Sequence, residues 1–128
     1  MSVKDVADGL VERCRQGDFL GAVDRFYGDD IVSIEPVGSA EVPAELRGKT
    51  AVRGKNEWWD ENHQVHSVDV RGPFIGDNEF AVQYNMDVTN KTNGQRMQMK
   101  EVALYEVKGD RIVREQFFYN PGASTTTE

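Results

Sequence analysis

Two glutamates lie where the surrounding sequence could turn a carboxyl group into an acid/base catalyst. Glu35 ends a short apolar run just before Pro36, and Glu101 lies between Met99 and Ala103 in an alternating stretch. A carboxyl group in an apolar pocket has its charged form disfavoured, so its pKa rises toward neutrality. Such a group can take a proton from carbon or water, and a second, neutral acid can donate a hydrogen bond.

A blander interpretation fits the same two residues. Glu35 could end its strand in solvent and Glu101 could pair with an arginine or lysine, because most acidic side chains are solvated. If both acids enter one pocket, they could also share a proton and titrate as a pair. The residue pattern leaves these interpretations open.

A cluster of aromatic residues and histidines is the next candidate: Trp58, Trp59, His63 and His66. The histidines are spaced like metal ligands but straddle a helix-to-strand junction without a nearby cysteine, so we predict no metal site. His63 is more typical of a partner for the helix dipole, with a proton-shuttle role as the minor option. Trp59 shares a helix side with Val52 and is expected to point inward, whereas Trp58 covers an edge or contacts a partner.

Several large side chains could line a pocket beside the two acids. The predicted lining residues are Tyr27, Trp59, His63, Tyr84, Met99, Tyr105 and Phe117. For most of them the simpler interpretation is core packing. Tyrosine hydroxyls that reach a cavity would supply hydrogen-bond donors. Cys14 falls on an apolar helical stripe and is expected to be a small buried hydrophobe, not a nucleophile.

The elements that must position these residues are helices first and strands afterward. Apolar residues at helical spacing predict one helix between Ser2 and Gly17, a second capped by Asp18 and ending at Tyr27, and a third over 49–62. A short strand is predicted over 31–35. From residue 64 the period is two, which predicts strands near 64–74, 79–91, 96–107 and 111–119.

The Asn93-Gly94 pair predicts a two-residue hairpin turn in which both residues have positive φ. Consecutive hairpins make a meander, so the predicted class is α+β, with N-terminal helices packed on a strongly curved, mainly antiparallel sheet in a cone. We predict one domain over 1–120 and a disordered tail over 121–128. The outward face of 96–107 is partly apolar, which favours a homodimer through the outer sheet face.

The composition of the 128-residue chain excludes some partners. A net charge of −7 with scattered Lys and Arg argues against nucleic-acid binding, because a phosphate backbone would be repelled. No apolar run approaches the roughly 20 residues that cross a bilayer, and we see no signal peptide, so the predicted location is cytoplasmic.

The chain resembles the nuclear transport factor 2-like superfamily, specifically its SnoaL-like and ketosteroid-isomerase-like members. Glu35, followed by Pro-Val-Gly-Ser at 36–39, matches the stretch whose acid is the general base of the isomerases. Glu101, eight residues before Gly109, matches the second acid, which donates a hydrogen bond to the developing oxyanion. This neutral-acid arrangement is a known feature of ketosteroid isomerase. The family's oxyanion tyrosine is absent, since Leu10 occupies its position.

The resemblance implies a small, largely apolar organic ligand, no cofactor, and acid/base isomerase, cyclase or (de)hydratase chemistry. Glu35 is the expected base, Glu101 the expected donor, and Tyr84 or Tyr105 could replace the missing tyrosine. The alternative is a non-catalytic dimeric module that holds a ligand or a protein. The fold hosts enzymes, binding domains and transport adaptors, so it does not choose between them.

Overall fold

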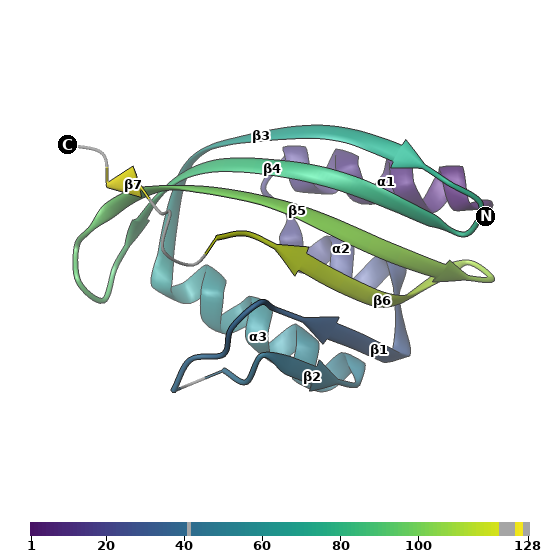
Figure 1. Ribbon diagram of the computed structural model, residues 1–128, viewed down its shortest axis with the longest axis horizontal. Helices are drawn as coiled ribbons and strands as arrows, with labels where there is room; N and C mark the ends of the chain where they lie inside the picture. The colour runs from purple at the N-terminus through teal and green to yellow at the C-terminus, as the bar shows by residue number, and fades with distance from the viewer. Residues whose placement is uncertain (41, 121–124, 127–128) are drawn as a thin grey trace.

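The computed structural model describes residues 1–40, 42–120 and 125–126. Its helices are α1 (Val3–Arg15), α2 (Phe19–Phe26) and α3 (Lys49–Asn62). Its strands are β1 (Tyr27–Ile34), β2 (Glu45–Arg47), β3 (His63–Ile75), β4 (Glu79–Asn90), β5 (Arg96–Lys108), β6 (Arg111–Phe118) and β7 (Thr125–Thr126). In Figure 1, α1 and α2 lie behind the long strands, and α3 lies near β1 and β2. The predicted α+β class with helices packed on a curved sheet is confirmed.

Local hydrogen bonds set where the first two helices begin. The Ser2 hydroxyl accepts from the Asp5 amide at 3.1 Å, and the Asp5 carboxylate accepts from the Ser2 amide at 3.0 Å. This reciprocal capping box starts α1. The Asp18 carboxylate accepts from the Gly21 amide at 2.9 Å and starts α2. Between the two helices, Gly17 has a φ of 76°, a conformation that favours glycine.

The strands form one open sheet in the order β2-β1-β6-β5-β4-β3 among the described residues, with β7 paired to β5. The β1–β6 pair is parallel and the other pairs are antiparallel. Long strands from β3 to β6 curve around the helices (Figure 1). The core fills the space between them and includes Val6, Leu10, Val23, Ile31, Val52, Phe80, Val82 and Ile112, each at most 1% exposed.

Several predicted boundaries hold, and others need correction. The helix over 49–62 is confirmed, and the four long strands begin and end within one residue of their predicted positions. The strand predicted over 31–35 instead begins at Tyr27, directly after α2 ends at Phe26. The loop after it contains the unpredicted β2, whose residues pair with the end of β1.

The two-residue turn predicted at Asn93-Gly94 is wrong. The β4–β5 connection spans 91–95, and only Gly94, at 73°, has positive φ there. The Asn90 amide donates to the Gln95 carbonyl at 2.8 Å and the Gly94 amide to the Asn90 carbonyl at 2.7 Å, so the hairpin closes around a longer loop. Most of the predicted disordered tail over 121–128 lies outside the described residues, and its described part is the short strand β7.

Candidate active site

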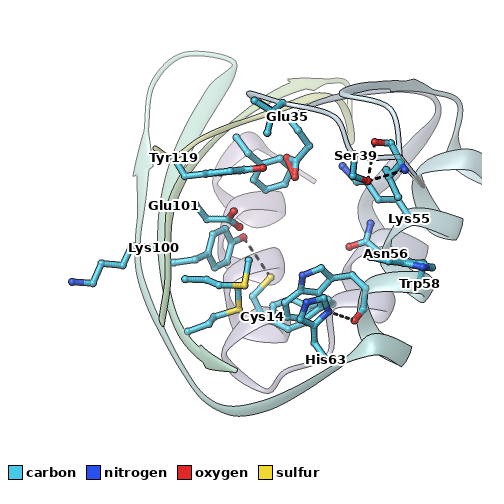
Figure 2. Close-up of a pocket in the computed structure, with 18 of the residues that line it drawn as sticks. Cys14, Glu35, Ser39, Lys55, Asn56, Trp58, His63, Lys100, Glu101 and Tyr119 are labelled. Carbon is cyan, nitrogen blue, oxygen red and sulfur yellow. Dashed lines mark hydrogen bonds between the residues drawn. The ribbon is translucent and has the colours of Figure 1, made fainter. Parts of the chain in front are cut away.

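A cavity of about 620 Å³ lies between the concave side of the sheet and the helices (Figure 2). This volume is within the range of about 300–1,000 Å³ that is usual for small-molecule sites. One end carries Glu35, Glu101 and Tyr119, whose side chains lie near one another in Figure 2. Cys14 and His63 lie at the other end in Figure 2, where Trp59 stacks on His63 and Phe19 contacts Trp59. The cavity is therefore polar at one end and apolar at the other.

Glu35 enters the cavity directly after β1, at the start of the loop that leads to β2. Its amide donates to the Ala44 carbonyl at 2.8 Å, which holds the two sides of the loop together. Its Oε2 atom is buried and has no hydrogen-bond partner among the described residues. Burial raises the pKa of Glu35 to about 7; the charge of Lys55 lowers it, and that of Glu115 raises it.

Glu101 points into the cavity from the middle of β5. It lies opposite Tyr84 in β4, two residues from the fully buried Ala103, so strand alternation faces it inward. Burial raises the pKa of Glu101 to about 8, the charges of Glu35 and Glu115 raise it further, and Lys55 opposes them. Because Glu35 and Glu101 interact, loss of a proton from one disfavours loss from the other.

Tyr119 follows β6 and supplies a hydroxyl beside both acids. Burial raises its pKa to about 12, and the charges of Glu35 and Glu101 add to the effect. Its hydroxyl therefore stays protonated at neutral pH and can donate a hydrogen bond. In Figure 2 its ring lies between the two glutamates.

Two other tyrosine hydroxyls pair with each other deeper in the cavity. Tyr84 and Tyr105 are joined by a 2.7 Å hydrogen bond, and the Cys14 sulfur lies 3.5 Å from the Tyr84 oxygen. Burial raises the pKa of the Cys14 thiol to about 12, so the thiol stays neutral. This matches the prediction that Cys14 is a buried hydrophobe, although it also touches the cavity.

The aromatic end is built where α3 meets β3. Trp59 stacks on His63 with ring centres 4.4 Å apart, and Phe19 meets Trp59 edge-on at 6.1 Å. The His63 Nδ1 atom lies 2.8 Å from the Trp59 carbonyl, and the His66 Nε2 atom lies 2.7 Å from the Thr89 hydroxyl. Within the described residues, no three His, Cys, Asp or Glu side chains converge as a metal site would require.

A buried polar network lies behind the polar end of the cavity. Glu115, 1% exposed on β6, accepts a hydrogen bond from the Tyr27 hydroxyl and another at 2.7 Å from Ser33. Ser33 in turn accepts from the Lys55 ammonium at 2.6 Å. The network joins β1, β6 and α3 beneath the acids.

Every residue predicted for the site lines this cavity, and their functional roles stay predictions. The Tyr27 hydroxyl donates its hydrogen bond to Glu115. Sequence reasoning assigned no role to Lys55 or Glu115. A signal for Lys55 existed, since it follows Val52 by three residues and so shares the inward side of α3.

The SnoaL-like domain family matches residues 1–119, nearly the whole chain. The chain belongs to this family. The predicted resemblance is confirmed at that level. No curated protein sequence matches the chain.

One solved structure gives the same family assignment, and two others share the fold. A candidate SnoaL-like polyketide cyclase from Mesorhizobium loti is 40% identical with a TM-score of 0.87, over 93% of this chain and 100% of that one. A candidate isomerase from Bacillus subtilis is 16% identical with a TM-score of 0.75, and the match covers 94% of this chain and 91% of that one. A candidate polyketide cyclase from Pseudomonas putida is 14% identical with a TM-score of 0.70, and the match covers 94% of this chain and 93% of that one. The last two show the fold alone. Within the described part of this SnoaL-like domain, no helix has the length and apolar character to cross a membrane.

Proposed function

We propose that the chain catalyses cofactor-independent proton transfer on a small, largely apolar organic molecule, as an isomerase, a cyclase or a (de)hydratase. One observation carries the proposal: Glu35 and Glu101 line a single cavity, and burial raises the pKa of each toward neutrality. Such values suit acid/base catalysts that work near neutral pH. Perturbed carboxyl groups in a cleft are also typical of functional sites.

The two acids have different roles. Glu35 is the base, because its buried Oε2 atom has no hydrogen-bond partner among the described residues and burial raises its pKa to about 7. Glu101, with a pKa of about 8, keeps its proton when Glu35 is ionised and donates a hydrogen bond to the substrate oxygen that gains charge. Tyr119 is a second donor beside them. The unpartnered Glu35 Oε2 atom supports its role, because a base must have a lone pair free for the substrate.

The different polarity of the two ends of the cavity sets the orientation in which a substrate binds. An apolar, preferably planar, body fits against Trp59, His63 and Phe19, and its reacting group then reaches Glu35 and Glu101 at the opposite end. Aromatic surfaces favour stacked or edge-on ring contacts, which adds specificity for unsaturated substrates. The cyclase description of the Mesorhizobium loti protein is consistent with such substrates.

A general-base probe tests the role of Glu35. In 5-nitrobenzisoxazole, a base removes the C3 proton, the C–H electron pair forms the nitrile, and the N–O bond breaks to release a coloured phenolate. We expect the protein to accelerate this ring opening, with a rate that rises as pH passes about 7, because only the ionised Glu35 can accept the proton.

Glu35→Gln should remove this acceleration while the thermal midpoint stays near that of the unmodified protein. Glu61→Gln is the matched control, because Glu61 is exposed at the end of α3 and changes the charge equally. Unchanged turnover in Glu35→Gln would refute the base role. No acceleration by the unmodified protein would favour the alternative, a module that holds a ligand without transforming it.

We also propose that the chain forms a homodimer through the outer face of its sheet. Val102 and Phe118 are cross-strand partners, 40% and 48% exposed, on the face away from the cavity. Farther along the same strands, the cross-strand pair Glu106 and Arg114 offers both signs of charge, which a two-fold axis can match. Sedimentation should give a dimer, and Phe118→Lys should give a monomer with an unchanged fold. A monomeric unmodified protein would exclude the dimer.

A further inference from the structure

Lys55 is a cation held in a fixed position in the wall of the cavity. It projects from α3, on the side of the cavity opposite Glu101 (Figure 2). Its ammonium donates to the Ser33 hydroxyl at 2.6 Å and lies 5.3 Å from the centre of the Phe117 ring. Two contacts from different elements, β1 and β6, therefore hold one ammonium group.

The groups behind Lys55 make this position rigid. Ser33 is fully buried and donates its only hydroxyl proton to Glu115 at 2.7 Å, so it can only accept from Lys55. Glu115 also accepts from the Tyr27 hydroxyl and is 1% exposed. The direction of every hydrogen bond in the network is set, and it runs toward Glu115.

This arrangement leaves binding capacity on the cavity side. An ammonium has three N–H donors, and Ser33 takes one. The charge of Lys55 lowers the pKa of both Glu35 and Glu101, which places the ammonium within electrostatic reach of the two acids. The other lysine of the described lining, Lys100, points away from the cavity in Figure 2.

We propose that Lys55 binds an oxygen of the ligand that carries or develops negative charge, such as a carboxylate, a phenolate or an enolate. This inference rests on the proposed function of the cavity and names its substrate class: an apolar, unsaturated molecule with an acidic or enolisable oxygen. Ser33 and Glu115 are positioning residues that hold the ammonium. The same contact supplies a charged donor in a cavity where Leu10 stands in the place of the family's oxyanion tyrosine.

Binding of a matched probe pair tests the proposal without turnover. 2-Naphthoate carries a carboxylate, and 2-naphthamide has the same shape without the charge. At pH 6, below the pKa values of about 7 and 8, the two glutamates are largely uncharged and do not repel the anion. Calorimetry should show naphthoate binding about tenfold more tightly than naphthamide, because a charge-assisted hydrogen bond is stronger than a neutral one.

Lys55→Met should abolish this preference, and Lys55→Arg should keep most of it. Lys100→Met removes the same charge from a side chain that points outward and should leave the preference unchanged. If Lys55→Met does not fold, Lys55→Gln replaces it, because the amide can still donate to Ser33 without carrying charge.

Three results would overturn the assignment: equal binding of the two probes, binding of neither, or a preference that survives in Lys55→Met. Repeating the titration with Glu35→Gln separates this claim from the catalytic one. An anion preference kept in that variant supports Lys55 even if the ring-opening test fails. Equal binding of the two probes by an unmodified protein that opens the ring at the expected rate refutes Lys55 alone.

Discussion

Glu115 and the Glu35–Glu101 pair are carboxyl groups in neighbouring parts of one sheet, but the protein surrounds them differently. Glu115 is 1% exposed and accepts hydrogen bonds from Tyr27 and Ser33. Glu35 is also inside, yet its Oε2 atom has no partner among the described residues. A buried polar group with partners stabilises its neighbours, whereas one without partners is destabilising and chemically reactive. The comparison separates a structural acid from two acids poised for chemistry.

The largest effect is expected on the structural side. Glu115→Ala removes the acceptor for two buried hydroxyls and leaves the network below Lys55 incomplete, so the free energy of unfolding should fall by about 3–5 kcal/mol. Urea denaturation measures the change, with Glu61→Ala as an exposed control. A loss below about 1 kcal/mol would show that the network does not support the fold.

Glu101→Gln should act in the opposite direction and only at high pH. The folded-state pKa of about 8 lies above the ordinary value of 4.5, so the folded protein keeps a proton that the unfolded chain releases. Stability is then full below pH about 4.5 and is lost as pH rises through 8. The amide cannot ionise, so the variant should gain about 2–4 kcal/mol at pH 9 and little at pH 4.5.

Thermal or urea unfolding at the two pH values measures this difference. The matched control is Glu61→Gln, which makes the same substitution at an exposed position. An identical change in stability at both pH values would mean that Glu101 is as solvated as Glu61. Glu101 would then no longer count as an acid poised for chemistry.

Tyr119→Phe should have the smallest effect. Its hydroxyl lies beside both glutamates, so its loss should slow the ring opening of 5-nitrobenzisoxazole about tenfold. This is less than the roughly 10²–10³-fold loss typical of a principal oxyanion donor, because Glu101 still donates. Tyr84→Phe should slow it less, because the Tyr84 hydroxyl is already bonded to Tyr105. The reverse order would return the donor role to Tyr84, as the sequence suggested.

Strand periodicity predicts most of the fold, and the inward face of β5 follows from it. Met99, Glu101 and Ala103 alternate with exposed residues, and they face the cavity or the core as expected. The start of β1 at Tyr27 was missed because the stretch that follows, Gly28-Asp29-Asp30, is typical of a turn. Pairing with β6 overrides that local preference.

Glu115 could not be placed by alternation. Ile112 is buried, so strict alternation along β6 would put Arg114 inside and Glu115 outside. The register shift between β5 and β6 inserts one extra residue, since Glu106 pairs with Arg114 and Val107 with Ile112. This bulge reverses the faces after it and turns Glu115 inward. A sequence pattern carries no clear sign of such a bulge.

Carbon-13 NMR of the glutamate carboxyl groups, followed from pH 3 to 10 and assigned with Glu35→Gln and Glu101→Gln, tests the central claim most directly. We expect two late titrations, near pH 7 for Glu35 and near pH 8 for Glu101, with each shifted downward when the other is replaced by the amide. Two independent titrations near the ordinary value of 4.5 would contradict it, and the cavity would then be a binding site without an acid/base pair.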